Sequence, residues 1–123
     1  MITAMPRIAI AIHDFQKCLA TFRDTLGMPV VDLSKSSVAS LGAKVAMCVP
    51  EGGSNIEIMS PAVPNVPLSH SLQKFLARRG ELLFSLMFEA PDPNTEADAL
   101  AGRGLNVFPL MSGAGGCDVH PNS

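Results

Sequence analysis

Two stretches of this chain follow the same pattern, and this duplication constrains the fold more than any single residue does. The first is IAIAIHDFQKCLATFRDTLGMPVVDL, residues 8–33, and the second is LFSLMFEAPDPNTEADALAGRGLNVFPL, residues 83–110. Each contains an apolar strand, an acidic cap, an amphipathic helix, a glycine stop and another apolar strand, in that order. The corresponding positions are Asp14 and Asp92, Gly27 and Gly104, and Val31 and Val107. A repeat of this length exceeds a solenoid unit and predicts two related half-domains that share one core.

Length and composition limit the class of protein. A chain of 123 residues predicts a single domain, residues 1–123, and 47% hydrophobic residues argue against disorder. The net charge of −2 offers no basic face, so neither a nucleic acid nor an anionic membrane is an expected partner. No apolar run reaches the roughly 18–20 residues that span a bilayer, and the first residues show no signal-peptide pattern. Because Cys18, Cys48 and Cys117 have no C-x-x-C spacing, a reducing, cytoplasmic location is expected.

The residue pattern predicts an α+β fold in which two modules follow one another. Alternating apolar residues predict strands, and Asp14 and Asp92 are favourable helix N-caps. The expected strands are 7–13, 28–33, 41–49, 54–60, 81–89, 105–111 and 117–120, and the expected helices follow Asp14, span 69–79 and follow Asp92. The first module is therefore 7–60, a proline-rich connector and short helix occupy 61–80, and a second, incomplete module is 81–123.

The helix after Asp14 is predicted to bury one apolar stripe. Its members recur at helical spacing and are Phe15, Cys18, Leu19, Phe22 and Leu26. Cys18 is therefore interpreted as core packing rather than a reactive thiol, because free cysteines are usually buried.

Several segments resemble the vicinal oxygen chelate superfamily, which includes glyoxalase I, bleomycin-resistance proteins, extradiol dioxygenases and methylmalonyl-CoA epimerase. These segments are IAIHDFQKCLATFRDTLGM, NIEIMSP, LQKFLARRGELLFSLMFEA and VHPNS. The resemblance covers nearly the whole chain and is nearest to the methylmalonyl-CoA epimerase branch. It implies paired βαβββ modules whose mixed sheet curls into a cup, with the ligand inside the cup and the helices outside it.

The resemblance also implies where a metal ion would be held, and this sequence departs from the pattern there. Family enzymes place one ligand on each of four strands. The positions of the first three are occupied by Arg7, Glu57 and Ser85, and the strand that carries the fourth does not appear in the sequence. One carboxylate does not hold a transition metal, and a guanidinium repels one. The sequence therefore predicts no metal site and no cofactor, with His13, His70 and His120 interpreted as surface or structural residues.

Strand alternation predicts which side chains face the cup. The residues expected to line it and to bind a ligand are Arg7, Ala9, Ala11, Glu57, Met59, Ser85 and Met87. We expect Arg7 and Glu57 to form a buried ion pair where the metal would lie, with Ser85 hydrogen-bonded nearby, because pairing offsets the cost of burying a charge.

Two functions are compatible with these residues. The first is a metal-free module that binds a small apolar or acyl-thioester-type ligand, for instance a CoA thioester. The second is an isomerase or lyase of the methylmalonyl-CoA epimerase or lactoylglutathione lyase type, in which Glu57 is the catalytic base and Arg7 stabilises an enolate. Arg78 and Arg79 either close a helix or contact the phosphates of CoA.

The incomplete second module has a further implication. Without its last strand, the sheet would leave unpaired backbone groups at an open edge. A second subunit could cover that edge, so a homodimer is expected.

Overall fold

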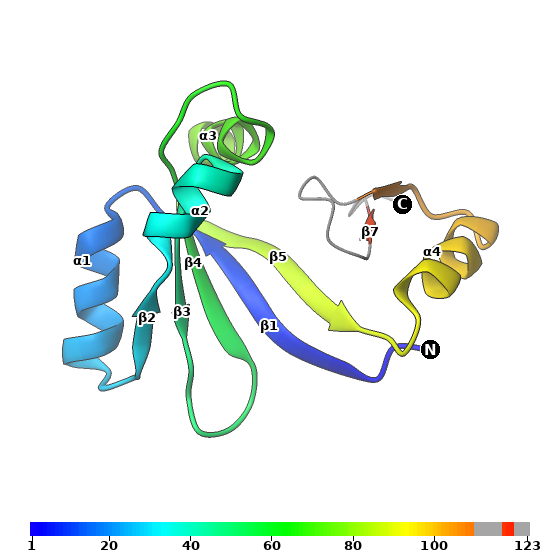
Figure 1. Cartoon of the computed structure of the whole chain (residues 1–123), viewed down its shortest axis with the longest axis horizontal. Coiled ribbons are helices and arrows are strands. Elements are labelled where there is room, and N and C mark those ends of the chain that lie inside the picture. Colours follow the sequence, from blue (N-terminus) through cyan, green and yellow to red (C-terminus); the bar gives the residue numbers. More distant parts are fainter. Residues whose placement is uncertain (110–116, 120–123) are drawn as a thin grey trace. The chain divides into compact units, whose positions relative to one another are not determined.

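The computed structural model describes residues 1–109 and 117–119 (Figure 1). Five strands form one mixed sheet in the order β2-β3-β4-β1-β5, and two short strands form a separate pair, β6-β7. The strands are β1 (Ala4–Ala11), β2 (Val30–Asp32), β3 (Ala43–Cys48), β4 (Asn55–Pro61), β5 (Leu82–Glu89), β6 (Val107–Pro109) and β7 (Cys117–Val119). The helices are α1 (Phe15–Ala20), η1 (Thr21–Thr25), α2 (Ser34–Leu41), α3 (Pro67–Arg79) and α4 (Pro93–Gly102). This is the predicted α+β class.

The register of the sheet places β4 at its centre, between β3 and β1. Strand β1 pairs with β4 in parallel, with Ala9 opposite Glu57, whereas β3 pairs with β4 in the antiparallel sense, with Met47 opposite Glu57. The predicted turn at 51–54 joins β3 and β4 as a hairpin, where Gly53 has a φ of 81°. The fifth strand, β5, is the edge of the sheet next to β1.

The helix after β1 begins as predicted and then widens. The side chain of Asp14 accepts a hydrogen bond from the N–H of Lys17 and caps α1. After Ala20 the backbone forms a π-helical turn, in which the N–H of Leu26 donates to the carbonyl of Thr21 at 3.0 Å. The wider turn rotates the following residues away from the stripe. Leu26 is consequently 56% exposed, so its predicted place in the buried stripe is wrong.

Helices cover both faces of the central strands, and each face has its own core. On one face, Ile12 and Ile58 pack with Phe15 and Leu19 of α1, as the alternation predicts. On the opposite face, a second core joins α3 to the small residues of the strands. Its buried members are Ala9, Ala11, Ala43, Val45, Met59, Leu72 and Leu76. Helix α1 packs against β4, and α2 and α3 lie together at one end of the strands (Figure 1).

By compactness the chain divides into two units, residues 5–87 and residues 1–4 with 88–123. The first unit holds the large sheet with α1, α2 and α3. In the second, α4 begins at Pro93 behind the N-cap Asp92, whose side chain accepts hydrogen bonds from the N–H groups of Asn94 and Thr95. The predicted module limits, 7–60, 61–80 and 81–123, and the single-domain assignment stay predictions. No helix among the described residues is long and apolar enough to cross a membrane.

Candidate functional site

The predicted pair of Arg7 and Glu57 is present in the structure. Arg7 lies on β1 and Glu57 on β4, and the Arg7 Nε approaches Glu57 Oε2 to 3.4 Å. Ala9 is the partner of Glu57 in the parallel register, so these two side chains are on the same face of the sheet. Arg7 is two residues before Ala9 on β1 and therefore shares that face. The Glu57 side chain is 12% exposed, but that of Arg7 is 41% exposed. The ion pair is therefore half-open to solvent rather than buried.

The environment of Glu57 disfavours its charge. Burial raises the pKa of Glu57 above its ordinary value, and the charge of Arg7 only partly opposes this increase. A carboxylate whose desolvation outweighs its ion pairing is a stronger base than a solvated carboxylate. The pair thus provides a half-exposed cation next to a proton acceptor that holds its proton more tightly than usual.

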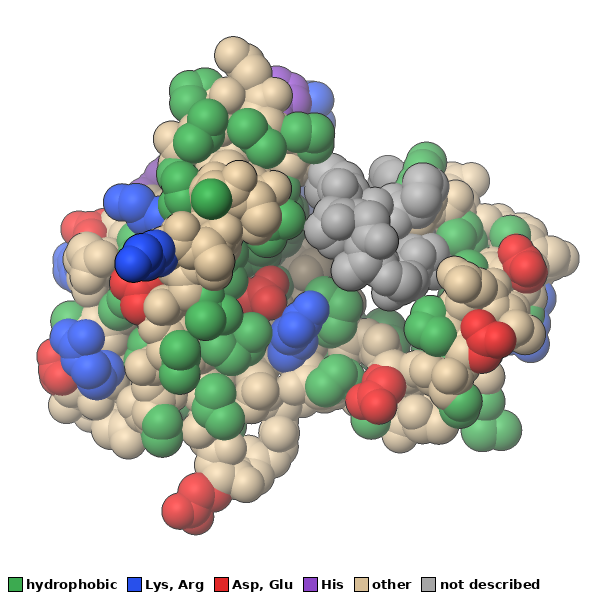
Figure 2. Space-filling model, viewed as in Figure 1, with side chains coloured by type: hydrophobic (Ala, Val, Ile, Leu, Met, Phe, Trp, Pro, Cys, Tyr) green, Lys and Arg blue, Asp and Glu red, His purple; other side chains and the backbone are tan. Residues whose placement is uncertain are grey.

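Apolar side chains surround this pair on the same face of the sheet. Met47 of β3 is opposite Glu57, and Val31 of β2 is opposite Met47. Met47 is half-buried, whereas Val31 is 51% exposed. Figure 2 shows acidic and basic side chains close together among hydrophobic ones on the side of the molecule in view. Such a surface can accept an apolar group that ends in a polar or anionic function.

Three of the residues expected to line the cup are closed off by α3. Ala9 is 2%, Ala11 0% and Met59 6% exposed, because Leu72 and Leu76 of α3 pack directly over them. The expectation that helices lie only outside the cup is wrong for this part of the sheet. Short side chains on the strands allow the helix to approach closely, so the open part of the face begins at Arg7 and Glu57.

Ser85 and Met87 lie on the other face of β5. Phe84 packs against the core beneath α3, and its ring meets that of Phe75 edge-on at a centroid distance of 5.2 Å. Alternation then turns Ser85 and Met87 toward the opposite face, away from Arg7 and Glu57. The predicted hydrogen bond from Ser85 to the ion pair is therefore wrong. The sequence LLFSLMF is apolar at nearly every position, so nothing in it fixed the phase of the alternation, and a slip of one residue reverses every side chain.

The donors on the described residues do not fit a transition-metal site. No group of three or more His, Cys, Asp and Glu side chains within 1–109 and 117–119 is arranged to hold a metal ion. Glu57 is the carboxylate on this face, and its neighbour is a cation that has no lone pair to donate. His70 is exposed on α3, and His120 is outside the described residues.

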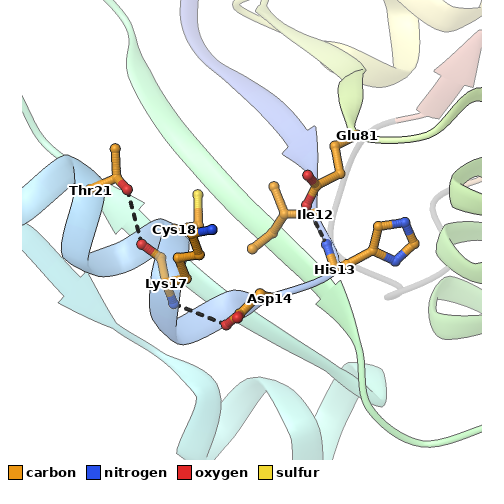
Figure 3. Close-up of a pocket in the computed structure, with 7 residues that line it drawn as sticks. All are labelled: Ile12, His13, Asp14, Lys17, Cys18, Thr21 and Glu81. Atoms are coloured by element: carbon orange, nitrogen blue, oxygen red, sulfur yellow. Dashed lines mark hydrogen bonds between the residues drawn. The ribbon is translucent and has the colours of Figure 1, made fainter.

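A separate hollow of about 350 Å³ lies where β1 meets α1. It is lined by Ile12, His13, Asp14, Lys17, Cys18, Thr21 and Glu81, which Figure 3 shows as sticks. The backbone N–H of His13 donates to Glu81 Oε2 at 2.7 Å, and the His13 imidazole points away from the Cys18 thiol. Burial raises the pKa of Cys18, and Cys48 and Glu81 raise it further. A thiol that stays protonated near neutral pH agrees with the interpretation of Cys18 as core packing.

Sequence reasoning missed Met47 as a residue of the site. The strand predicted at 41–49 contains it, but its face depends on the register with β4. The hairpin turn at 51–54 would have given that register, because loop length fixes which residues of the two strands are opposite.

Comparisons of sequence identify no relative, whereas comparisons of structure do. No protein-family model and no curated protein matches the sequence. A hypothetical protein from Bacillus halodurans C-125 has a TM-score of 0.79 at 22% identity, covering 97% of this chain and 85% of that one. A variant of Streptomyces coelicolor methylmalonyl-CoA epimerase, in complex with 2-nitronate-propionyl-CoA, has a TM-score of 0.76 at 24% identity, covering 99% and 88%.

Methylmalonyl-CoA epimerase from Mycobacterium tuberculosis gives a TM-score of 0.75 at 20% identity, covering 98% of this chain and 81% of that one. These epimerases are members of the vicinal oxygen chelate superfamily. The chain therefore has the epimerase-type, glyoxalase-like fold that its sequence motifs resemble. At identities this low, the likeness establishes the fold and not the activity.

Proposed function

We propose that this protein binds a small apolar or acyl-thioester-type ligand on the sheet face around Arg7 and Glu57, without a metal ion. The observation that carries this proposal is the half-exposed ion pair. Arg7 Nε lies 3.4 Å from Glu57 Oε2, and Met47 and Val31 border the pair on the same face. Here one end of Arg7 is open, and a ligand can reach it.

The structural neighbours support a thioester as the ligand. One neighbour is a methylmalonyl-CoA epimerase in complex with methylmalonyl-CoA, and another holds 2-nitronate-propionyl-CoA. A shared fold permits, but does not require, a shared ligand. The apolar surface next to a cation on this chain suits a short acyl group with a polarised carbonyl.

Isothermal titration with propionyl-CoA in the presence of EDTA tests the proposal. Val31→Glu puts a charge on the proposed face, and Leu26→Glu makes the same kind of change at a site of similar exposure, 56% against 51%, in the η1 region. We expect Val31→Glu to weaken binding about tenfold or more, and Leu26→Glu to leave it unchanged. Absence of binding, or binding that appears only when a divalent metal is added, would contradict the proposal.

A second function is an isomerase or lyase that uses Glu57 as its base. The raised pKa of Glu57 favours this function, because a catalytic base works best when its pKa approaches the working pH. The half-open Arg7 would stabilise the enolate that forms when the base removes the proton next to the carbonyl.

Proton exchange separates catalysis from binding. Methylmalonyl-CoA incubated in D2O and EDTA with the catalyst gains one deuterium at the carbon next to the thioester carbonyl, which mass spectrometry detects. We expect Glu57→Gln to abolish this exchange and Glu51→Gln, in the β3–β4 turn, to retain it. If the wild-type protein binds the thioester but exchanges no proton, the binding function stands and the enzymatic one is wrong.

A further inference from the structure

The hollow where β1 meets α1 is a second concave surface, on the other face of the sheet from Arg7 and Glu57. Its volume of about 350 Å³ is within the range of small-molecule sites, which begins at about 300 Å³. Ile12 lines the hollow and packs in the core beneath α1, whereas Ala9, which shares the face of Glu57, packs beneath α3. The proposed thioester face therefore makes no use of this hollow.

The least exposed residues of the hollow are apolar or weakly polar. Ile12 is 5% exposed and Cys18 is half-buried, and both pack in the core that α1 covers, whereas the other lining residues are exposed. Burial, and then the charges of Cys48 and Glu81, raise the pKa of the Cys18 thiol. A thiol that stays protonated behaves as a small hydrophobic group. The inner part of the hollow therefore suits an aliphatic or aromatic group.

Two carboxylates lie at the entrance, and a backbone N–H holds each of them. The N–H of His13 donates to Glu81 Oε2 at 2.7 Å, and the N–H of Lys17 donates to Asp14 Oδ1 at 3.1 Å. The second oxygen of each carboxylate accepts no hydrogen bond from the residues that the structure describes. The negative charge of Glu81 acts on the thiol beside it, so this carboxylate lies close to the inner part of the hollow. Each free oxygen can accept a hydrogen bond from a bound cation.

Lys17 adds a positive charge to the same hollow without pairing with either carboxylate. Figure 3 shows the three side chains coming from the start of α1 and from the segment before β5. Within the described part of the chain, no ion pair joins Lys17 to Asp14 or Glu81. Opposite charges that border one hollow but do not meet are both complemented by a ligand that carries one charge of each sign. A ligand with a single charge would be attracted by one group and repelled by the other.

We propose that this hollow is a second binding site, for a free α-amino acid with an apolar side chain. The ammonium group contacts Glu81, the carboxylate contacts Lys17, and the side chain lies against Ile12 and Cys18. An α-amino acid carries both charges on one carbon, so a single small molecule reaches all of these groups. At about 30 Å³ for a water-sized group, the hollow holds on the order of ten such groups, which is enough for leucine or phenylalanine.

Three molecules that share one side chain test the inference. Leucine, 3-methylbutylamine and 4-methylpentanoate have the same branched group, but the amine lacks the carboxylate and the acid lacks the ammonium. Phenylalanine, 2-phenylethylamine and 3-phenylpropanoate form the same series with an aromatic ring. Titrations of the full ¹⁵N-labelled chain by NMR measure the affinities, and the amide shifts of residues 12–21 and 81 locate the site. We expect one or both amino acids to bind with a dissociation constant of about 1 mM or below, and their singly charged analogues to bind about tenfold more weakly.

Variants assign each charge to its residue. Lys17→Gln should make the amino acid and its amine bind equally, because the partner of the carboxylate is lost. Glu81→Gln should do the same for the amino acid and its acid, and the Gln oxygen can still accept the N–H of His13. Lys35→Gln on α2 and Glu51→Gln in the β3–β4 turn remove exposed charges and should leave every ratio unchanged. Thermal melting checks that each variant is folded.

The wild-type titrations alone can overturn the inference. Binding of both amino acids weaker than about 1 mM would do so, as would equal affinity for an amino acid and its singly charged analogues. Shifts confined to amides around Arg7 would place the ligand on the thioester face and would also overturn it. The titration with propionyl-CoA decides the proposed function separately, because the two sites share no residue.

Discussion

At the scale of single residues, three carboxyl groups have a clear pKa shift, and that of Glu57 is opposite in direction to those of Asp24 and Asp92. The pKa values of Asp24 and Asp92 are lowered by hydrogen bonds, whereas burial raises that of Glu57 above its ordinary value of 4.5. A raised pKa means that the folded protein binds this proton more tightly than the unfolded chain does. The contribution of Glu57 to the free energy of unfolding is therefore fully present below about pH 4.5 and is lost as the pH rises through the raised value.

Replacing Glu57 with Gln should remove this pH dependence. We expect the free energy of unfolding of the wild-type protein, relative to that of Glu57→Gln, to decrease as the pH increases from 4 to 8. Urea denaturation at each pH measures the difference, and Glu51→Gln in the exposed β3–β4 turn is the matched control. A difference that increases with pH would mean that Arg7 outweighs burial and that the pKa is lowered.

The pairing of Arg7 with Glu57 was predictable, and its solvent exposure was not. Period-two alternation placed both side chains on one face, and the cost of an isolated charge required a partner. Their solvent exposure depends on how far α3 extends over the sheet. Tertiary packing determines this, and the sequence of the strands does not encode it. Ser85 shows the same limit, since a strand that is apolar on both sides carries no signal for its own phase.

At the scale of elements, the turn between α2 and β3 fixes the approach of α3. Gly42 has a φ of 71° and accepts hydrogen bonds from the N–H groups of Ala62 and Val63. A Cβ at Gly42 would lie 2.6 Å from the Cβ of Val66, the residue before α3. Only glycine meets both the backbone conformation and this close contact.

We expect Gly42→Ala to destabilise the protein by about 2–4 kcal/mol, as backbone strain and overlap with Val66 add. Gly27→Ala is the control, because Gly27 has a similar φ of 70° but no neighbour within 4 Å of an added Cβ. It should cost about 1 kcal/mol, from strain alone. Equal losses in thermal or urea denaturation would contradict the role of the Val66 contact.

Helix α3 is part of the core in this structure rather than a loose cover over the site. Leu72 is fully buried against the strands, at 0% exposure. We expect Leu72→Ala to reduce the free energy of unfolding by about 2–5 kcal/mol, because it leaves a cavity in the core. Leu68, which packs only at the margin of the same core, should lose less when changed to Ala. A loss below about 1 kcal/mol at Leu72 would indicate that α3 is readily displaced.

Elements with strong local signals were predicted well, and those without them were missed. The cap at Asp14, the hairpin at 51–54 and the start of α4 at Pro93 all agree with the sequence. Helix α2 was not predicted, because its sequence SKSSVASL has little apolar periodicity and several serines, which favour turns. The π-helical turn after Ala20 was also missed. Because of this turn, Leu26 is exposed instead of buried with the other apolar residues of the helix.

At the scale of the whole molecule, the strands of the two similar stretches of sequence pair differently among the described residues. Of the strands that the structure describes, β1 to β4 lie in the large sheet with β5. The strands β6 and β7 pair with each other in a separate ribbon. The duplicated sequence therefore predicts the order of the elements, but it does not predict which strands pair with which.

The edge strand β5 should make the protein self-associate. Leu82 is 53%, Leu83 50% and Leu86 47% exposed, and β5 contains no Lys or Pro of the kind that protects an edge. Pairing of β5 with a second copy would satisfy the backbone groups of β5 that have no partner among the described residues, and it would cover part of these leucines. A homodimer with an extended sheet is therefore expected, and sedimentation equilibrium at micromolar concentrations measures it.

Leu83→Lys should convert this dimer to a monomer, because a charge on the strand opposes both edge pairing and the burial of the apolar surface. Leu26→Lys removes a leucine of similar exposure, 56% against 50%, from the η1 region and should leave the dimer intact. Both variants should remain folded, since neither leucine is in a core, and Leu83→Lys should lose only the stability that dimerisation adds. A wild-type monomer, or a dimer that persists in Leu83→Lys, would show that β5 is not the surface through which two copies associate.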